Sequence, residues 1–145
     1  MTEERLDPIE ERLRSTPAAI YQELVDMLKL RIARYEPLLP SRPLSCKEED
    51  RQFNIFCGET SKDRYISHLH LALLRDRVQA NADFYSKRHP FSEETYTTPH
   101  RFEVLYTIKV EWDHETHSRV ATMDEDVTAV DSIAETLIER ILFID

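Results

Sequence analysis

Four residues that can bind a metal ion or transfer a proton occur within five positions of the chain: Asp113, His114, Glu115 and His117. Imidazole nitrogens and carboxylate oxygens are common zinc ligands, and both groups act as general acids and bases. The cluster therefore indicates one candidate activity, a small metal-dependent hydrolase. The zinc-protease motif, however, sets two histidines four positions apart on one helical face, whereas His114 and His117 are three apart.

The residues on both sides of this cluster favour another interpretation. They alternate as β-strands do, so 113–117 is expected to be the turn of a hairpin. A five-residue connection without glycine is readily built on a type I turn that starts at an aspartate, here Asp113. A metal would need a third ligand, which the sequence does not identify. We therefore predict a polar hairpin tip with no cofactor, and the metal site is the alternative.

A second pair of histidines, His68 and His70, lies in a segment whose apolar residues have helical spacing. On the helix predicted for 61–85, side chains two positions apart point in nearly opposite directions and would not chelate one ion. On a β-strand the two histidines would share a face, and this conclusion would be reversed.

Cysteine and glycine usage limits the chemistry further. Cys46 and Cys57 do not form a C-x-x-C motif and are expected to be reduced thiols. Gly58 is the only glycine of the chain. Phosphate-binding loops and dinucleotide fingerprints need several glycines, and a nucleophile elbow needs small residues around its serine. The sequence therefore excludes these three kinds of site.

Acidic residues are concentrated at the C-terminal end. The net charge is −9, and residues 110–145 contain ten Asp or Glu and two Arg. Phosphate contacts need clustered Lys and Arg, so nucleic-acid binding is disfavoured there and a basic partner is favoured. Asp131, Glu135 and Glu139 would line one stripe of a helix, where like charges cost roughly 0.2–0.5 kcal/mol per pair. A basic partner would relieve this repulsion, and so would a basic residue of the same chain.

The elements that position these residues are expected to form one domain over 1–145. The predicted class is α+β: a helix-rich domain with a small antiparallel sheet. Ser45 and Glu48 could cap a short helix, and 53–57 is either its end or a strand. The remaining predicted segments are a helix from about Ser15 to Tyr35, a proline-rich linker at 37–45, a polar surface loop at 86–99 and an amphipathic C-terminal helix at about 126–143. No apolar run could span a membrane and no secretory signal is visible, so a cytoplasmic location is expected, with the nucleus left open.

The clearest strand covers about 101–112, where apolar and polar residues alternate. With the turn at 113–117, Trp112 would pair with Ser118, and the return strand at 118–123 would end before it reached residues 101–105. The opposite edge would also be open unless 53–57 covered it.

The unpaired start of this long strand is the predicted contact surface. Unpaired backbone groups need partners, and between His100 and Trp112 there is no proline or glycine to protect the edge. We expect another protein chain, a second copy or a different subunit, to complete it. The predicted partner-binding residues are Arg101, Phe102, Glu103, Val104 and Leu105 on the strand and Asp131, Glu135 and Glu139 on the helix.

The sequence thus predicts a non-enzymatic interaction subunit of an intracellular complex that binds neither nucleic acid nor membrane. One alternative is the metal-dependent hydrolase at 113–117, which metal analysis of the purified protein would test. The other is an acidic inhibitor that mimics nucleic acid in a basic groove, for which binding should be strongly salt-sensitive.

Overall fold

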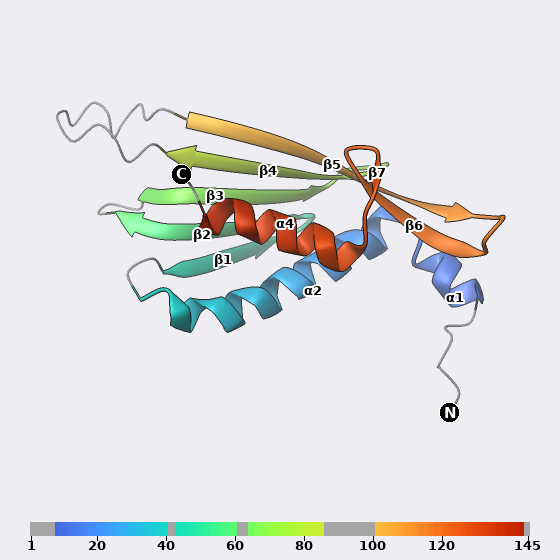
Figure 1. The fold of residues 1–145 in the computed structure, drawn as a ribbon, viewed down its shortest axis with the longest axis horizontal. Helices are drawn as coiled ribbons and strands as arrows, with labels where there is room; N and C mark the ends of the chain where they lie inside the picture. The colour runs from blue at the N-terminus through green and yellow to red at the C-terminus, as the bar shows by residue number, and fades with distance from the viewer. Residues whose placement is uncertain (1–7, 41–42, 61–63, 86–100, 144–145) are drawn as a thin grey trace.

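The structure, a computed structural model, describes residues 8–40, 43–60, 64–85 and 101–143. In this part of the chain, seven strands form one antiparallel sheet in sequence order, and helices α2 and α4 cover one face of it (Figure 1). The strands are β1 (Leu44–Glu49), β2 (Gln52–Thr60), β3 (Arg64–Leu73), β4 (Val78–Tyr85), β5 (Arg101–Asp113), β6 (Ser118–Met123) and β7 (Asp126–Val127). The helices are α1 (Pro8–Leu13), α2 (Pro17–Tyr35) and α4 (Val130–Leu142), with a 3-10 turn at Glu36–Leu38.

The prediction of a helix-rich fold is wrong, because the chain is mostly a seven-stranded sheet. The 61–85 segment, predicted as one helix, contains β3 and β4. The short helix expected near Ser45 is strand β1, and 53–57 lies in β2. In β3, Leu69 and Leu71 are fully buried, whereas the histidine between them lies on the other face. The spatial period of this segment is therefore two residues, as in a strand.

Helix α2 begins where the sequence predicts. Thr16 is its N-cap, since the Thr16 Oγ1 accepts a hydrogen bond from the Ala19 N–H at 3.2 Å, and Pro17 occupies the first turn. The C-terminal helix is also present, but it begins at Val130 rather than near 126, because Asp126 and Val127 pair with β6. No helix in the described ranges is long and apolar enough to cross a bilayer.

The core lies between the two long helices and the sheet face that they cover. Alternate strand residues and one stripe of each helix supply it; the fully buried large side chains include Ile20, Leu24, Leu28, Phe53, Ile55, Leu69, Leu71, Ile108, Ile133, Leu137 and Ile141. The buried Ser67 hydroxyl of β3 donates to the Ile141 carbonyl at 2.6 Å. This bond satisfies one of the carbonyls left unpaired at the end of α4.

The segment that leads from α2 to the sheet is shorter than the predicted 37–45 linker. Residues 36–38 form the 3-10 turn, and β1 already begins at Leu44. Within β2, Gly58 has a φ of 76°, a conformation that residues with a side chain rarely adopt, and its N–H donates to the Pro43 carbonyl at 2.9 Å. The predicted loop at 86–99 lies outside the described residues.

Candidate functional site

Strand β5 is longer than its neighbours, so each neighbour pairs with only part of it (Figure 1). On one edge β4 pairs with residues 101–108, although the sequence left that edge open unless 53–57 covered it. On the other edge β6 pairs with residues 108–113. No residue that the structure describes pairs with 101–106 on the β6 side. This stretch is the unpaired edge.

The register of the β5–β6 hairpin differs by one residue from the prediction. Ser118 pairs with Asp113 instead of Trp112, and Trp112 pairs with Arg119. The cause is a connection of four residues, 114–117, which ends with His117 in the left-handed region at a φ of 51°. A shift of one residue exchanges the two faces of β6, so Ala121 and not Val120 is buried.

Asp124 ends the β5–β6 ladder. The Asp124 N–H donates to the Thr107 carbonyl at 2.8 Å, and the Thr107 N–H donates to the Asp124 Oδ1 at 2.8 Å. A side-chain carboxylate thus takes the place of the next backbone acceptor. Both backbone groups of Thr107 are satisfied, and the chain can leave the sheet at this point.

The Thr107 contacts also define which groups the unpaired edge presents. In an antiparallel strand both backbone polar groups of a residue point to the same side, and successive residues alternate sides. Because Thr107 points toward the β6 side, the N–H and C=O groups of Leu105, Glu103 and Arg101 point there too. The residues between them point toward β4. The unpaired edge therefore offers three donors and three acceptors.

A tight acidic turn carries the chain away from the unpaired edge. Asp124 and Glu125 have φ values of 51° and 75°, and Met123 pairs with Asp126, which describes a two-residue type I′ hairpin. Asp124, Glu125 and Asp126, here called the acidic turn, are all exposed. The sequence predicts the start of the C-terminal helix at about Asp126, the last residue of this turn. The sequence signal that could have revealed the turn is Asp124. Aspartate tolerates positive φ, and this one directly follows a segment in which apolar and polar residues alternate.

Different side chains flank the unpaired edge on the two faces of the sheet. Leu105 is 52% exposed and lies on the face of the sheet opposite the helices. Tyr106 is buried on the helix side, where its hydroxyl accepts a hydrogen bond from Arg140 Nε at 2.7 Å. An exposed leucine on one face and a fixed tyrosine on the other therefore flank the open backbone groups.

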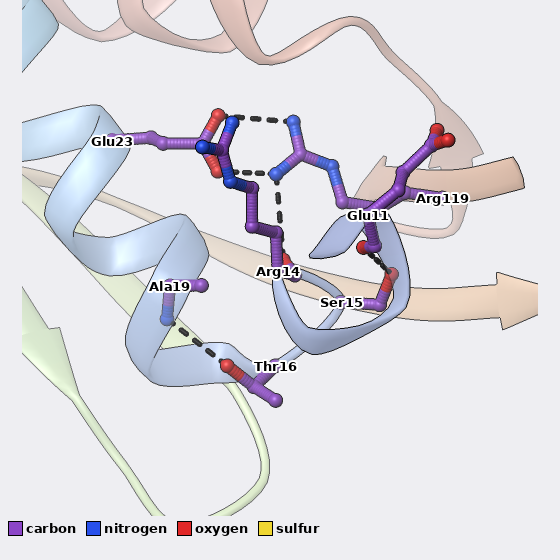
Figure 2. Close-up of polar contacts among 7 residues, drawn as sticks. All are labelled: Glu11, Arg14, Ser15, Thr16, Ala19, Glu23 and Arg119. Atoms are coloured by element: carbon purple, nitrogen blue, oxygen red, sulfur yellow. Dashed lines mark hydrogen bonds and ion pairs between the residues drawn. The ribbon is translucent and has the colours of Figure 1, made fainter. Parts of the chain in front are cut away.

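An ion pair between β6 and α2 holds β6 in place. Figure 2 shows Arg119 of β6 facing Glu23 of α2 through both of its terminal nitrogens. The Arg119 Nη2 lies 3.0 Å from the Glu23 Oε1, and Nη1 contacts Oε2. Nη1 also lies 3.4 Å from the carbonyl oxygen of Arg14, in the connection between α1 and α2. This ion pair ties β6 to α2 near the tip of the hairpin, since Arg119 pairs with Trp112.

The predicted acidic stripe of α4 is partly neutralised within the chain. Arg31 of α2 contacts the Asp131 Oδ1 through Nη2 and the Glu135 Oε2 through Nη1, both at 2.7 Å. Arg31 is thus a basic residue of the same chain that relieves the repulsion between these carboxylates, which was the predicted alternative to a basic partner. Glu139 is exposed, and in the described part of the chain no ion pair is found for its carboxylate.

The 113–117 cluster is a polar turn at the end of the β5–β6 hairpin. His114, Glu115 and His117 are exposed, and the Asp113 Oδ1 accepts a hydrogen bond from the Glu115 N–H at 2.9 Å. This bond, with smaller contributions from Thr116, holds the pKa of Asp113 below its usual value. Among the described residues, no group of three or more His, Cys, Asp and Glu is placed to hold a metal ion.

His68 and His70 lie on β3 and share the helix-free face of the sheet, since the segment is a strand. The rings are 6.3 Å apart, but each has its own neighbour. His68 stacks on Phe56 at 4.8 Å, its Nε2 lies 2.7 Å from the Asn54 Oδ1, and its Nδ1 lies 3.6 Å from the Asp83 carboxylate. This arrangement suits a packed polar network across β2, β3 and β4 better than ligands that converge on one ion.

Cys46 is exposed and Cys57 is buried, and the two do not form a disulfide. They lie on neighbouring strands but not opposite each other, because Cys46 pairs with Ile55.

No protein-family model matches this chain, and no curated protein or solved structure is significantly similar to it.

Proposed function

We propose that the protein is a non-enzymatic interaction module that accepts an extended segment of another protein chain on the unpaired edge of β5. The observation that carries the proposal is the end of the ladder at Asp124, beyond which residues 101–106 have no pairing neighbour among the described residues on the β6 side. Backbone pairing supplies affinity in this mode of recognition, and the side chains beside the edge supply specificity.

The unpaired edge lacks one of the usual protections against strand addition, a proline. Natural edges are blunted by proline, by bulges or by inward-pointing charges. Strand β5 contains no proline, and Leu105, near the end of the edge where the β6 ladder stops, is exposed. The opposite edge of the sheet differs, because β1 exposes five consecutive residues that include Lys47, Glu48 and Glu49. An extended segment is therefore expected to add more readily to the edge of β5 than to that of β1.

The proposal depends on the β5 edge and not on the stripe of α4. Arg31 already neutralises two of the three predicted acidic contacts. A basic partner that bound α4 would have to compete with Arg31, whereas the backbone groups of the β5 edge face no such competitor among the described residues.

A matched pair of substitutions at Leu105 tests the proposal. Leu105→Pro removes an N–H that points away from β4, so it should block strand addition and leave the β4–β5 pairing intact. Leu105→Thr removes the same leucine side chain and retains the N–H. Extended peptides selected from a random library against the wild-type protein should bind the threonine variant and lose at least tenfold in affinity for the proline variant, a loss of about 1.4 kcal/mol.

Two results would contradict the proposal. One is a library that yields no peptide whose binding shifts the amide resonances of 101–105. The other is equal binding to the proline and threonine variants, with both shown to be folded by circular dichroism.

A further inference from the structure

The geometry points to the orientation and charge of the segment that binds the β5 edge: an extended strand antiparallel to β5, with Lys or Arg at its N-terminal end. This inference rests on the proposed function, since it describes the partner of the same edge. Three features carry it: the direction of β6, the position of the acidic turn and the absence of ion pairs between this turn and any described cation.

The direction follows from the strand that the partner would extend. β6 is antiparallel to β5, and a partner on residues 101–106 would continue the line of β6 beyond Met123. The neighbour on the other edge, β4, is antiparallel as well. Antiparallel pairing makes straight hydrogen bonds and is slightly stronger per residue than parallel pairing. In this direction the residue opposite Leu105 comes early in the partner strand, and the residue opposite Arg101 comes late.

The acidic turn then lies beside the start of the partner strand. Asp124 stands where the ladder stops, bonded to Thr107, and Glu125 and Asp126 follow it in the turn. The Asp124 carboxylate accepts the Thr107 N–H, and no described cation forms an ion pair with Asp124, Glu125 or Asp126. A Lys or Arg at the start of the partner segment would therefore meet carboxylates of the acidic turn that have no ion-pair partner among the described residues. The other end of the segment would lie opposite Arg101, which is itself a cation.

The Leu105 side chain adds a requirement for one apolar residue. Directly opposed residues of an antiparallel pair place their side chains on the same face, about 5 Å apart. Leu105 is half exposed on the helix-free face. The partner residue opposite it is therefore expected to be β-branched or aromatic, because such a side chain would cover the leucine.

Two blocked peptides with the same composition test the orientation. Each alternates threonine and valine over six positions, and two lysines stand at the N-terminal end of one peptide and at the C-terminal end of the other. Binding is measured by fluorescence anisotropy at low salt, and the site is mapped by amide chemical shifts. An exposed charge pair adds only modestly to affinity, so the peptide with N-terminal lysines should bind about three- to tenfold more tightly.

A variant of the acidic turn with less negative charge provides the control. Glu125→Gln combined with Asp126→Asn leaves Asp124 and its bonds to Thr107 in place, and it should reduce the preference between the peptides. High salt should have the same effect, because it screens exposed charges.

The outcomes separate the inference from the proposed function. Equal binding of the two peptides, or tighter binding of the peptide with C-terminal lysines, with shifts at Glu103 and Leu105, would overturn the inference and leave the proposed function standing. No shift at these amides with either peptide would overturn both. A dimer of the chain alone in light scattering, lost in Leu105→Pro and kept in Leu105→Thr, would identify a second copy as the occupant and overturn the basic partner.

Discussion

Removal of the Arg119 guanidinium should destabilise the fold more than removal of an exposed cation. The Arg119 and Glu23 side chains are 20% and 32% exposed, and two contacts join them (Figure 2). Loss of one partner costs about 3–5 kcal/mol in a fully buried pair and about 0.2–1 kcal/mol in an exposed one. The exposure of the Arg119 and Glu23 side chains lies between these two cases. Arg119→Met should therefore lower the free energy of unfolding by about 2 kcal/mol.

The assay is urea unfolding of a double-mutant cycle formed by Arg119→Met, Glu23→Gln and their combination. We expect a coupling energy of about 1–2 kcal/mol, because each single substitution leaves the other group without its counterion. Lys29 and Glu48 supply the comparison, since they also form an ion pair, at 2.8 Å, but are 43% and 44% exposed. Lys29→Met should have a much smaller effect than Arg119→Met. The reasoning is refuted if the two effects are equal or if the coupling energy is zero.

Three further predictions concern other polar groups. Tyr21→Phe should raise stability by about 0.5–1 kcal/mol in urea unfolding, because the buried Tyr21 hydroxyl has no hydrogen-bond partner among the described residues. Burial, and then Glu48 and Asp50, raise the pKa of Tyr21 above 10.0, so the wild type should lose stability above about pH 10 and the variant should lose less. Arg31→Met should cost about 1 kcal/mol in the same assay, because the side chain is 13% exposed but its carboxylate partners are largely solvated. The lowered pKa of Asp113 means that its ionised carboxylate stabilises the fold above the carboxyl's usual pKa, near 3.8. This contribution is lost as the pH falls through the lower pKa of the folded state. Thermal melts of the wild type and of Asp113→Asn should therefore differ at neutral pH and converge in acid.

Features that depend on neighbouring residues could be predicted from the sequence. The start of α2 was correct because Thr16 and Pro17 act within the first turn. Strands β5 and β6 were correct because alternation over many positions fits no helix. The lack of a pairing partner for the start of β5 on the β6 side followed from strand lengths alone. Among the described residues it persists, although the predicted hairpin register was wrong by one residue.

Features that depend on distant residues were missed. β4 has alanines at two buried positions, Ala80 and Ala82, and alanine favours a helix when no tertiary contact opposes it. The short inward side chains leave room for α4, which packs against β3 and β4. The Arg31 pairs with Asp131 and Glu135 join positions about one hundred residues apart, and no local pattern indicates them. The Asp124 contact with Thr107 likewise appears only once the hairpin register is known.

The sequential strand order has a consequence for how the protein folds. Each strand pairs with the strand next to it along the chain, so the whole sheet can grow from one hairpin by successive additions. Such local topologies reach their transition state faster than those that must first close long loops. The docking of α2 on α4 joins the two ends of the described chain and should come last. We expect refolding to show early amide protection in β2–β4 and late protection in the helices.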